Sequence, residues 1–258
     1  MLASPESRQS AVSAPPPLPD PARTALFLDV DGTLAELRDQ PSQVIVPAST
    51  VAVLGRLHTA LHGAVVILSG RSGSGIDELL RPLALPYGAN HGAERRDLTG
   101  RIHRIDPPPG LPAALEALRQ GAAGWDGVLV EPKPLGVAVH YRMAPDRGEA
   151  VHKLVQAVAA RHAGQFDVQP GKMVFELKPR GVDKGGALRE FMRGTVLADR
   201  IPVMAGDDLT DESAFAAAQE AGGFGIKVGT GDSIAPWRLS GPADLARWLG
   251  ALCAKSGL

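Results

Sequence analysis

Aspartates follow two apolar segments of this 258-residue chain. Asp29 and Asp31 end the run ALFLDV within the motif DVDGT, and Asp207, Asp208 and Asp211 follow IPVMAG within GDDLTD. Five carboxylates gathered at one place repel one another, by roughly 4 kcal/mol for each pair about 4 Å apart at an effective dielectric near 20. A divalent cation and a lysine relieve that repulsion, and aspartate oxygens are hard ligands suited to Mg²⁺. The pattern therefore predicts magnesium-assisted chemistry on an anionic substrate.

Two further polar motifs occupy comparable positions. Ser69, Gly70 and Arg71 follow the run GAVVIL, and Lys184 begins a helical segment. Ligands of open parallel sheets bind beyond the carboxyl ends of the strands, so we expect these residues and the aspartates to share one polar edge. Taken singly, each motif has an ordinary structural explanation, since Asp-Gly is a common turn and Thr33 is a good helix cap. Their combination in a fixed order favours a functional site.

The apolar runs before these motifs predict an α/β core. Short continuous apolar runs are typical of strands buried on both faces, and residues 51–61, between the first two runs, repeat apolar residues at helical spacing. IPVMAGDD and GFGIKVG predict two more strands, each followed by a helical segment. We therefore predict a doubly wound, Rossmann-like parallel sheet over residues 23–106 and 180–258.

The middle of the chain, residues 107–179, has a different pattern and predicts an inserted α+β domain. Its strand-like segments alternate apolar and polar residues, which is typical of a sheet with one buried face. Two amphipathic segments, over 111–118 and 151–158, would cover the apolar face. We expect an antiparallel sheet with two helices on one side and charged side chains on the other.

Composition excludes several classes of protein. The chain is 44% hydrophobic, and 27 basic against 28 acidic residues leave a net charge of −1. No global field attracts nucleic acid or anionic membrane, and no apolar run has the length of a membrane span or the form of a signal peptide. The single cysteine, Cys253, has no internal disulfide partner. We expect a soluble, cytoplasmic monomer, preceded by a disordered Pro-, Ser- and Ala-rich tail over residues 1–22.

The four motifs together resemble those of the haloacid dehalogenase superfamily of phosphatases: DVDGT, SGR, the lysine of VDKGG, and GDDLTD. The insertion lies between the second and third motifs, where this superfamily places its larger cap domains. HGAE at 91–94, EPK at 131–133 and ELKPRGVDKG at 176–185 look like the trehalose-6-phosphate phosphatase family. The resemblance implies an Mg²⁺-dependent hydrolase of trehalose 6-phosphate.

The resemblance also implies a role for each motif residue. Asp29 would be the nucleophile that forms an aspartyl-phosphate, and Asp31 the general acid and then base. Asp29, the backbone carbonyl of Asp31 and Asp207 would bind Mg²⁺, while Asp208 and Asp211 would orient metal waters or Lys184. The choice among the last three aspartates stays open. The phosphoryl oxygens would be held by Lys184 together with Gly32, Thr33, Ser69 and Gly70.

Substrate recognition is expected from both parts of the chain. The resemblance implies that Glu131, Lys133 and Glu176 contact the sugar hydroxyls. Weaker candidates are Arg142, Lys172 and Lys178. Arg71, His91 and Glu94 are the candidates in the core, although His91 could equally be a structural histidine.

Two other functions remain open. One is the same chemistry on another phosphosugar, such as sucrose phosphate or mannosylglycerate phosphate, and the other is a catalytically silent phosphosugar-binding module. The presence of Asp29, Asp31 and Lys184 argues against the silent module. A dehalogenase is disfavoured because displacement of a halide requires neither the magnesium carboxylates nor a second aspartate as acid.

Overall fold

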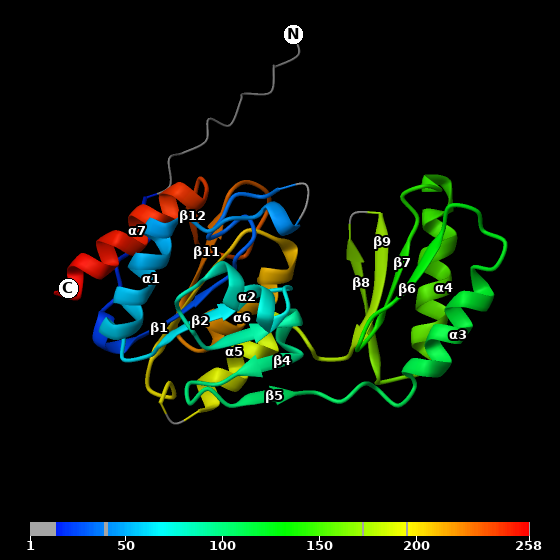
Figure 1. Ribbon diagram of the computed structural model, residues 1–258, viewed down its shortest axis with the longest axis horizontal. Helices are drawn as coiled ribbons and strands as arrows, with labels where there is room; N and C mark the ends of the chain where they lie inside the picture. The colour runs from blue at the N-terminus through cyan, green and yellow to red at the C-terminus, as the bar shows by residue number, and fades with distance from the viewer. Residues whose placement is uncertain (1–13, 39–40, 172, 195, 258) are drawn as a thin grey trace, which may run out of the picture.

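A computed structural model describes residues 14–38, 41–171, 173–194 and 196–257 (Figure 1). The larger part is built on an eight-stranded sheet with the order β12-β11-β10-β1-β2-β3-β4-β5. The parallel strands are β1 (Thr24–Leu28), β2 (Val65–Leu68), β3 (Tyr87–Ala89), β10 (Ile201–Gly206), β11 (Phe224–Val228) and β12 (Trp237–Leu239). Two antiparallel strands, β4 (Glu94–Arg96) and β5 (Ile102–Arg104), extend one edge.

Helices cover this sheet on both faces. They are α1 (Ala48–Ala60), α2 (Gly73–Leu79), α5 (Lys184–Arg193), α6 (Glu212–Glu220) and α7 (Pro242–Lys255). The chain passes from β1 through α1 to β2 in one direction along the sheet, and from β10 through α6 to β11 in the other. Right-handed crossovers in opposite directions place their helices on opposite faces. Helix α7 packs with α1, and α5 packs with α6, so the sheet is doubly wound.

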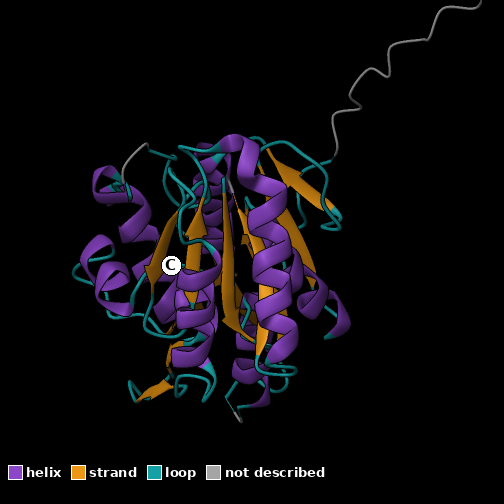
Figure 2. Ribbon diagram, turned by 90° about the vertical axis from the view of Figure 1, so that its right-hand side faces the viewer, coloured by secondary structure: helices purple, strands orange, loops and turns teal. Residues whose placement is uncertain are grey.

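The smaller part has its own sheet and its own core. Strands β6 (Leu129–Pro132), β7 (Val137–His140), β8 (Phe166–Gly171) and β9 (Val174–Pro179) pair antiparallel in the order β6-β7-β9-β8. Helices α3 (Leu111–Gly121) and α4 (Gly148–Arg161) lie side by side against one face, as seen from that end of the molecule in Figure 2. Val137, Val139 and Leu177 of the sheet are buried against Leu118 and Val155 of the helices. We call this part, residues 107–179, the cap.

The predicted fold class is confirmed. Among the strands of the core, the sequence analysis predicted β1, β2, β10 and β11 but missed β3, β4, β5 and β12. In the cap it missed strand β8. Strand β8 has the sequence FDVQPG, in which Asp167, Gln169 and Pro170 weaken any strand pattern. It is an edge strand, where a proline is tolerated because one side of the backbone has no partner strand.

The predicted disordered tail, residues 1–22, lies outside the described residues as far as residue 13. Within the described part of this stretch, Pro16 and Leu18 contact α7. The buried indole nitrogen of Trp248 donates to the carbonyl of Pro16 at 3.1 Å, and Lys255 Nζ donates to the carbonyl of Leu18 at 2.7 Å. A buried Trp N–H requires an acceptor, so Trp248 gives this proline-rich stretch a fixed place on the core.

Among the described residues, no helix combines the length and the apolar character needed to cross a membrane.

Candidate active site

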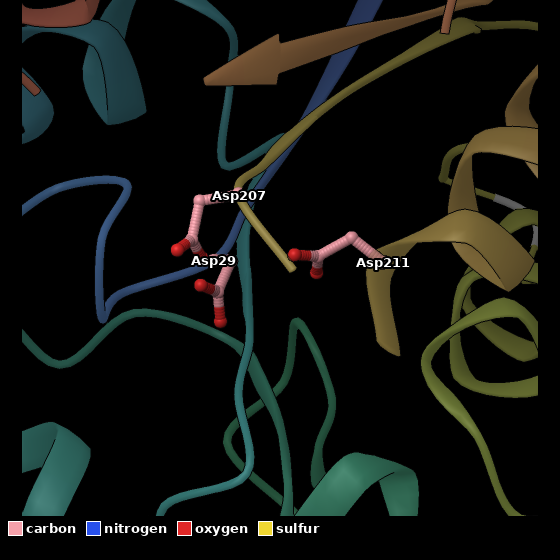
Figure 3. A group of neighbouring side chains, drawn as sticks. All are labelled: Asp29, Asp207 and Asp211. Atoms are coloured by element: carbon pink, nitrogen blue, oxygen red, sulfur yellow. The ribbon is translucent and has the colours of Figure 1, made fainter. Parts of the chain in front are cut away.

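Three aspartates converge at the carboxyl ends of two neighbouring strands. Asp29 follows β1, Asp207 follows β10, and Asp211 ends the short 3-10 helix Leu209–Asp211. One carboxylate oxygen from each lies within 4.8 Å of the others, and Figure 3 shows the three side chains pointing toward a common space. Parallel strands bring residues far apart in the chain to one edge of the sheet, which is where α/β sheets bind ligands.

Lys184 binds two of these carboxylates from the start of α5. Asp183 caps that helix by accepting from the amide of Gly186 at 2.7 Å. Lys184 Nζ then lies 2.7 Å from Asp29 Oδ1 and 2.7 Å from Asp211 Oδ1. Burial alone would lower the pKa of Lys184, but the two carboxylates raise it above its ordinary value. The lysine is therefore a permanent positive charge at the centre of the site.

Asp29 is buried and held from two sides. Burial raises the pKa of Asp29 to about 7, while Lys184 opposes this effect and Asp211 adds to it. The Thr33 hydroxyl donates to Asp29 Oδ2 at 3.3 Å. Thr33 is itself fully buried, so in this arrangement it orients the aspartate.

Asp207 has a carboxylate that none of the described side chains or amides hydrogen-bonds. Burial raises its pKa to about 6, and Asp211 and Asp208 act in the same direction. The carboxylate lies against Gly32, where a Cβ atom would come within 2.0 Å of Asp207 Oδ2. Gly32 also has a φ of +73°, so both the backbone and the available space favour glycine there.

The other two aspartates of GDDLTD are already engaged. Asp211 is fully buried, and its second oxygen accepts from the amide of Asp208 at 2.9 Å. Asp208 is exposed and accepts from the amide of Leu209 at 2.7 Å. A divalent cation therefore fits best beside Asp29 and Asp207, where two carboxylates have raised pKa values and one has no donor.

Asp31 is paired with Arg71 of the second motif. Arg71 Nε and Nη2 donate to the two carboxylate oxygens of Asp31 at 2.7 Å each. This hydrogen bonding raises the pKa of Arg71, and the Asp31 side chain is 33% exposed. A cavity of about 380 Å³ opens beside the pair, lined by Asp29, Asp31, Leu37, Ser69, Gly70, His91, Lys184, Asp207, Asp208 and Thr210. Gly32 and Thr33 do not line it.

Two further cavities lie between the core and the cap. One, of about 180 Å³, is lined by Gly70 and His91 of the core and by Lys133, Glu176 and Lys178 of the cap. The other, of about 580 Å³, is lined by residues that include Lys184 and Gln169 of β8. Four of the predicted substrate residues thus face a cleft that adjoins the acidic site: His91, Lys133, Glu176 and Lys178.

Four predicted substrate residues do not line these three cavities: Arg71, Glu94, Glu131 and Arg142. Arg71 is the partner of Asp31 described above. Glu131 lies 2.8 Å from Nε2 of His140, and this hydrogen bond lowers its pKa. Arg142 is exposed in the turn after β7, and Lys172 lies outside the described residues. Glu94 accepts from the Tyr87 hydroxyl and from Arg104 Nε, both at 2.8 Å, and so links β3, β4 and β5.

His91 lies where the core, the cap and the acidic site meet. Its backbone has a φ of +58°, which is uncommon for a side chain other than glycine, and its amide donates to the carbonyl of Ser69 at 2.9 Å. Burial, followed by Lys184 and Lys178, lowers the pKa of His91 to about 4. Its buried Nδ1 has no hydrogen-bond partner among the described residues. The imidazole is therefore neutral at physiological pH.

The sequence analysis missed two residues near the site. Gln169 belongs to strand β8, which was not predicted. Lys227, in β11, is 5% exposed, and its Nζ donates to the backbone carbonyl of Asp207. A lysine inside the otherwise apolar run GFGIKVG was the available signal, because a charge in a buried strand needs a partner.

Comparison with known proteins assigns the chain to a family. Residues 27–243 match the family model described as trehalose-phosphatase. The chain belongs to the trehalose-phosphatase family. A curated member, the trehalose-6-phosphate phosphatase of Escherichia coli (strain K12), is 42% identical over 229 residues, which cover 88% of this chain and 86% of that protein. The probable trehalose-phosphate phosphatase of Sinorhizobium fredii (strain NBRC 101917 / NGR234) is 39% identical over 80% of this chain and 77% of that protein.

Solved structures agree with this family. The trehalose-6-phosphate phosphatase of Aspergillus fumigatus superposes with a TM-score of 0.73 at 26% identity, over 90% of this chain and 93% of that one. A haloacid dehalogenase-like hydrolase from Bacteroides thetaiotaomicron shares the fold, with a TM-score of 0.65 at 15% identity over 89% and 99% of the two chains. As a trehalose-phosphatase, the chain is a phosphoric monoester hydrolase on the fold of the haloacid dehalogenase-like hydrolases.

Proposed function

We propose that this chain hydrolyses trehalose 6-phosphate to trehalose and inorganic phosphate, and that it requires Mg²⁺. The observation that carries the proposal is the buried pair of Asp29 and Lys184, beside a cavity that continues into a cleft lined by charged cap residues. A phosphoryl group suits the acidic, lysine-containing end of this space, and hydroxyl groups suit the end lined by Lys133, Glu176 and Lys178. The names of the curated relatives support the same substrate.

Asp29 supplies the nucleophile in this proposal. One of its oxygens forms a bond to phosphorus while the bond from phosphorus to the sugar oxygen breaks, which leaves an aspartyl-phosphate on the protein. Thr33 and Lys184 fix the direction of the carboxylate before the substrate arrives. Lys184, with Ser69 and Gly70 at the cavity wall, stabilises the negative charge that spreads over the phosphoryl oxygens.

Asp31 moves the protons. It donates one to the sugar oxygen as the trehalose leaves, and then, as a carboxylate, it takes one from the water that attacks the aspartyl-phosphate. Arg71 holds both of its oxygens in the absence of substrate. Asp31 lines the cavity and is partly exposed, so it is within reach of a leaving group there.

The carboxylates of Asp29 and Asp207 and the backbone carbonyl of Asp31 would hold Mg²⁺. When bound, the ion neutralises charge on the carboxylates and on the phosphoryl group, which lets an anionic substrate approach an anionic nucleophile. Asp211 and Asp208 would not bind the ion themselves. Asp211 positions Lys184, and Asp208 caps the helical turn that carries Asp211.

In the same proposal, residues 23–106 and 180–258 form the catalytic domain and the cap supplies specificity. Buried Cys253 is unpaired, which fits a reducing, cytoplasmic location, and we expect a monomer with no nucleic acid or membrane partner. A related candidate is hydrolysis of another phosphosugar, because the cap residues that line the cleft would also bind other polyols.

The test is a panel of phosphate esters assayed for released phosphate with and without EDTA. We expect trehalose 6-phosphate to be turned over best, Mg²⁺ to be required, and Asp29→Asn to reduce the rate to background. A higher kcat/KM for sucrose phosphate or mannosylglycerate phosphate would reassign the substrate. Equal rates for wild type and Asp29→Asn would indicate a silent binding module.

A further inference from the structure

Lys227 is a buried lysine whose contact differs from that of Lys184. Lys184 binds carboxylate oxygens, whereas Lys227 Nζ donates to the backbone carbonyl of Asp207. Among the described residues, no carboxylate forms an ion pair with Lys227. Its neighbours in β11, Ile226 and Val228, are apolar and buried. Burying an ammonium group costs several kcal/mol unless the surroundings compensate it, so this position calls for an explanation.

The position of Lys227 in the sheet explains how it reaches Asp207. Strands β10 and β11 are parallel neighbours, and Lys227 pairs in register with Gly206, the last residue of β10. The next residue in the chain is Asp207, at the carboxyl end of the strand. A lysine side chain extending from this register meets the carbonyl at which the chain leaves β10.

The contact fixes Asp207 without using its carboxylate. The backbone is held by the ammonium group of Lys227, and the side chain packs against Gly32. Both carboxylate oxygens remain without a hydrogen-bond donor from the described residues. A ligand for a metal ion benefits from this arrangement, since preorganisation of the ligand strengthens binding and a competing donor weakens it.

The charge of Lys227 acts in the same direction. Asp29, Asp207, Asp208 and Asp211 gather here, and Asp29 and Asp211 share Lys184. Lys227 is a second buried cation, and unlike Lys184 it does not line the cavity beside Asp207. It reduces the repulsion among the carboxylates in the absence of metal, and it does so from the protein interior, leaving the cavity side open.

We propose that Lys227 is a positioning residue for the metal site: it anchors the backbone of Asp207 so that the Asp207 carboxylate is preorganised for Mg²⁺. The inference rests on the proposed function, because it presumes that Asp207 is a magnesium ligand. It assigns Lys227 no contact with the substrate.

The experiment compares Mg²⁺ binding by wild-type protein, Lys227→Met and Lys255→Met, each freed of metal with EDTA and titrated calorimetrically. Methionine keeps the length of lysine and removes its charge and donors. Loss of a hydrogen bond to a residue that binds the metal typically weakens metal binding by about 10- to 100-fold, and we expect a loss of that size for Lys227→Met. Lys255 is the matched control, since it also donates to a backbone carbonyl, that of Leu18, but does so on the exposed face of α7. Its variant should bind Mg²⁺ as wild type does.

Two further measurements distinguish loss of the positioning of Asp207 from a general loss of protein stability. In the Asp207→Asn background, Lys227→Met should cause no additional loss of Mg²⁺ affinity, because the ligand through which it acts is gone. Saturating Mg²⁺ should restore most of the phosphatase kcat of Lys227→Met, with KM for the sugar phosphate close to wild type. If Lys227→Met does not fold, Lys227→Leu, which also removes the charge and the donors, is used in its place.

Wild-type Mg²⁺ affinity in a folded Lys227 variant would overturn the inference, as would a loss of the same size in the Asp207→Asn background. Failure of wild-type protein to bind Mg²⁺ is a different result: it would remove the metal from the proposed function itself.

Discussion

Replacement of Lys184 by methionine tests the electrostatic core of the site. The side chain of Lys184 is 3% exposed and holds Asp29 and Asp211, whose side chains are 6% and 0% exposed. Methionine has nearly the same length, so the substitution removes the charge with little change in packing. Two buried carboxylates then lose their only shared cation among the described residues.

The expected loss of stability follows from this geometry. Removing one partner of a buried ion pair costs about 3–5 kcal/mol, because the remaining charge is left without compensation. The chain can reduce this cost by protonating Asp29, whose pKa is already about 7. Between the ordinary value of 3.8 and that raised value, the folded chain binds a proton that the unfolded chain has lost. Stability therefore falls as pH rises through this window, at up to about 1.4 kcal/mol per pH unit.

Urea unfolding in EDTA at about pH 5.5 and pH 8 measures the effect, with unfolding free energies compared between wild type and variant. We expect Lys184→Met to lose about 3–5 kcal/mol at the higher pH and clearly less at the lower. Lys153→Met is the control, since Lys153 pairs with Glu149 on the surface, where the side chains are 73% and 80% exposed. Such a pair contributes about 0.3–0.5 kcal/mol. Equal losses in the two variants, or a loss for Lys184→Met that does not change with pH, would refute the account.

Three further substitutions test the neighbouring parts of the site. Gly32→Ala should lower Mg²⁺ affinity and kcat at least tenfold in titration and rate assays, because its Cβ would meet Asp207 and its backbone would be strained at positive φ. Glu176→Ala should lower kcat/KM for trehalose 6-phosphate far more than for an aryl phosphate too small to reach the cap; equal losses would contradict a role in sugar recognition. Arg71→Met should slow esters with poor leaving groups more than p-nitrophenyl phosphate, which needs no proton from Asp31; a uniform loss would count against positioning of the acid.

The architecture of the core and the cap could be predicted from two hydrophobic patterns: continuous apolar runs in the core, and alternation of apolar and polar residues in the cap. Continuous apolar runs such as VVIL in β2 are fully buried, as expected of central parallel strands. Alternation in the cap predicted a sheet with one buried apolar face, and Val137, Val139 and Leu177 form that face. Strand β8 could not be predicted in this way, because an edge strand is held by backbone pairing with β9 and needs no apolar pattern of its own.

The candidate site was predictable to the extent that strand ends determine it. Motifs after β1, β2 and β10 had to meet at one edge once the sheet was parallel, and they do. The sequence DDLTD does not reveal which aspartate carboxylate is available to a metal ion, because this depends on hydrogen bonds. Asp211 accepts from Lys184 and from the amide of Asp208. The Asp207 carboxylate accepts from none of the described donors. Ion pairs between residues far apart in the sequence could not be predicted either. Arg71 and Asp31 lie 40 residues apart and form a bidentate ion pair.

The two buried lysines, Lys184 and Lys227, bring positive charge to different aspartates of the site. Lys184 brings positive charge to Asp29 and Asp211 in the absence of metal, and it does so by contacting both carboxylates directly. A lysine placed in the same way on Asp207 would occupy the oxygens that a metal needs. Contact with the carbonyl of Asp207 supplies positive charge and rigidity to the same residue while the carboxylate stays available. A site that must be stable when empty and still bind a divalent cation requires both kinds of contact, and β11 provides the second one from within the hydrophobic sheet.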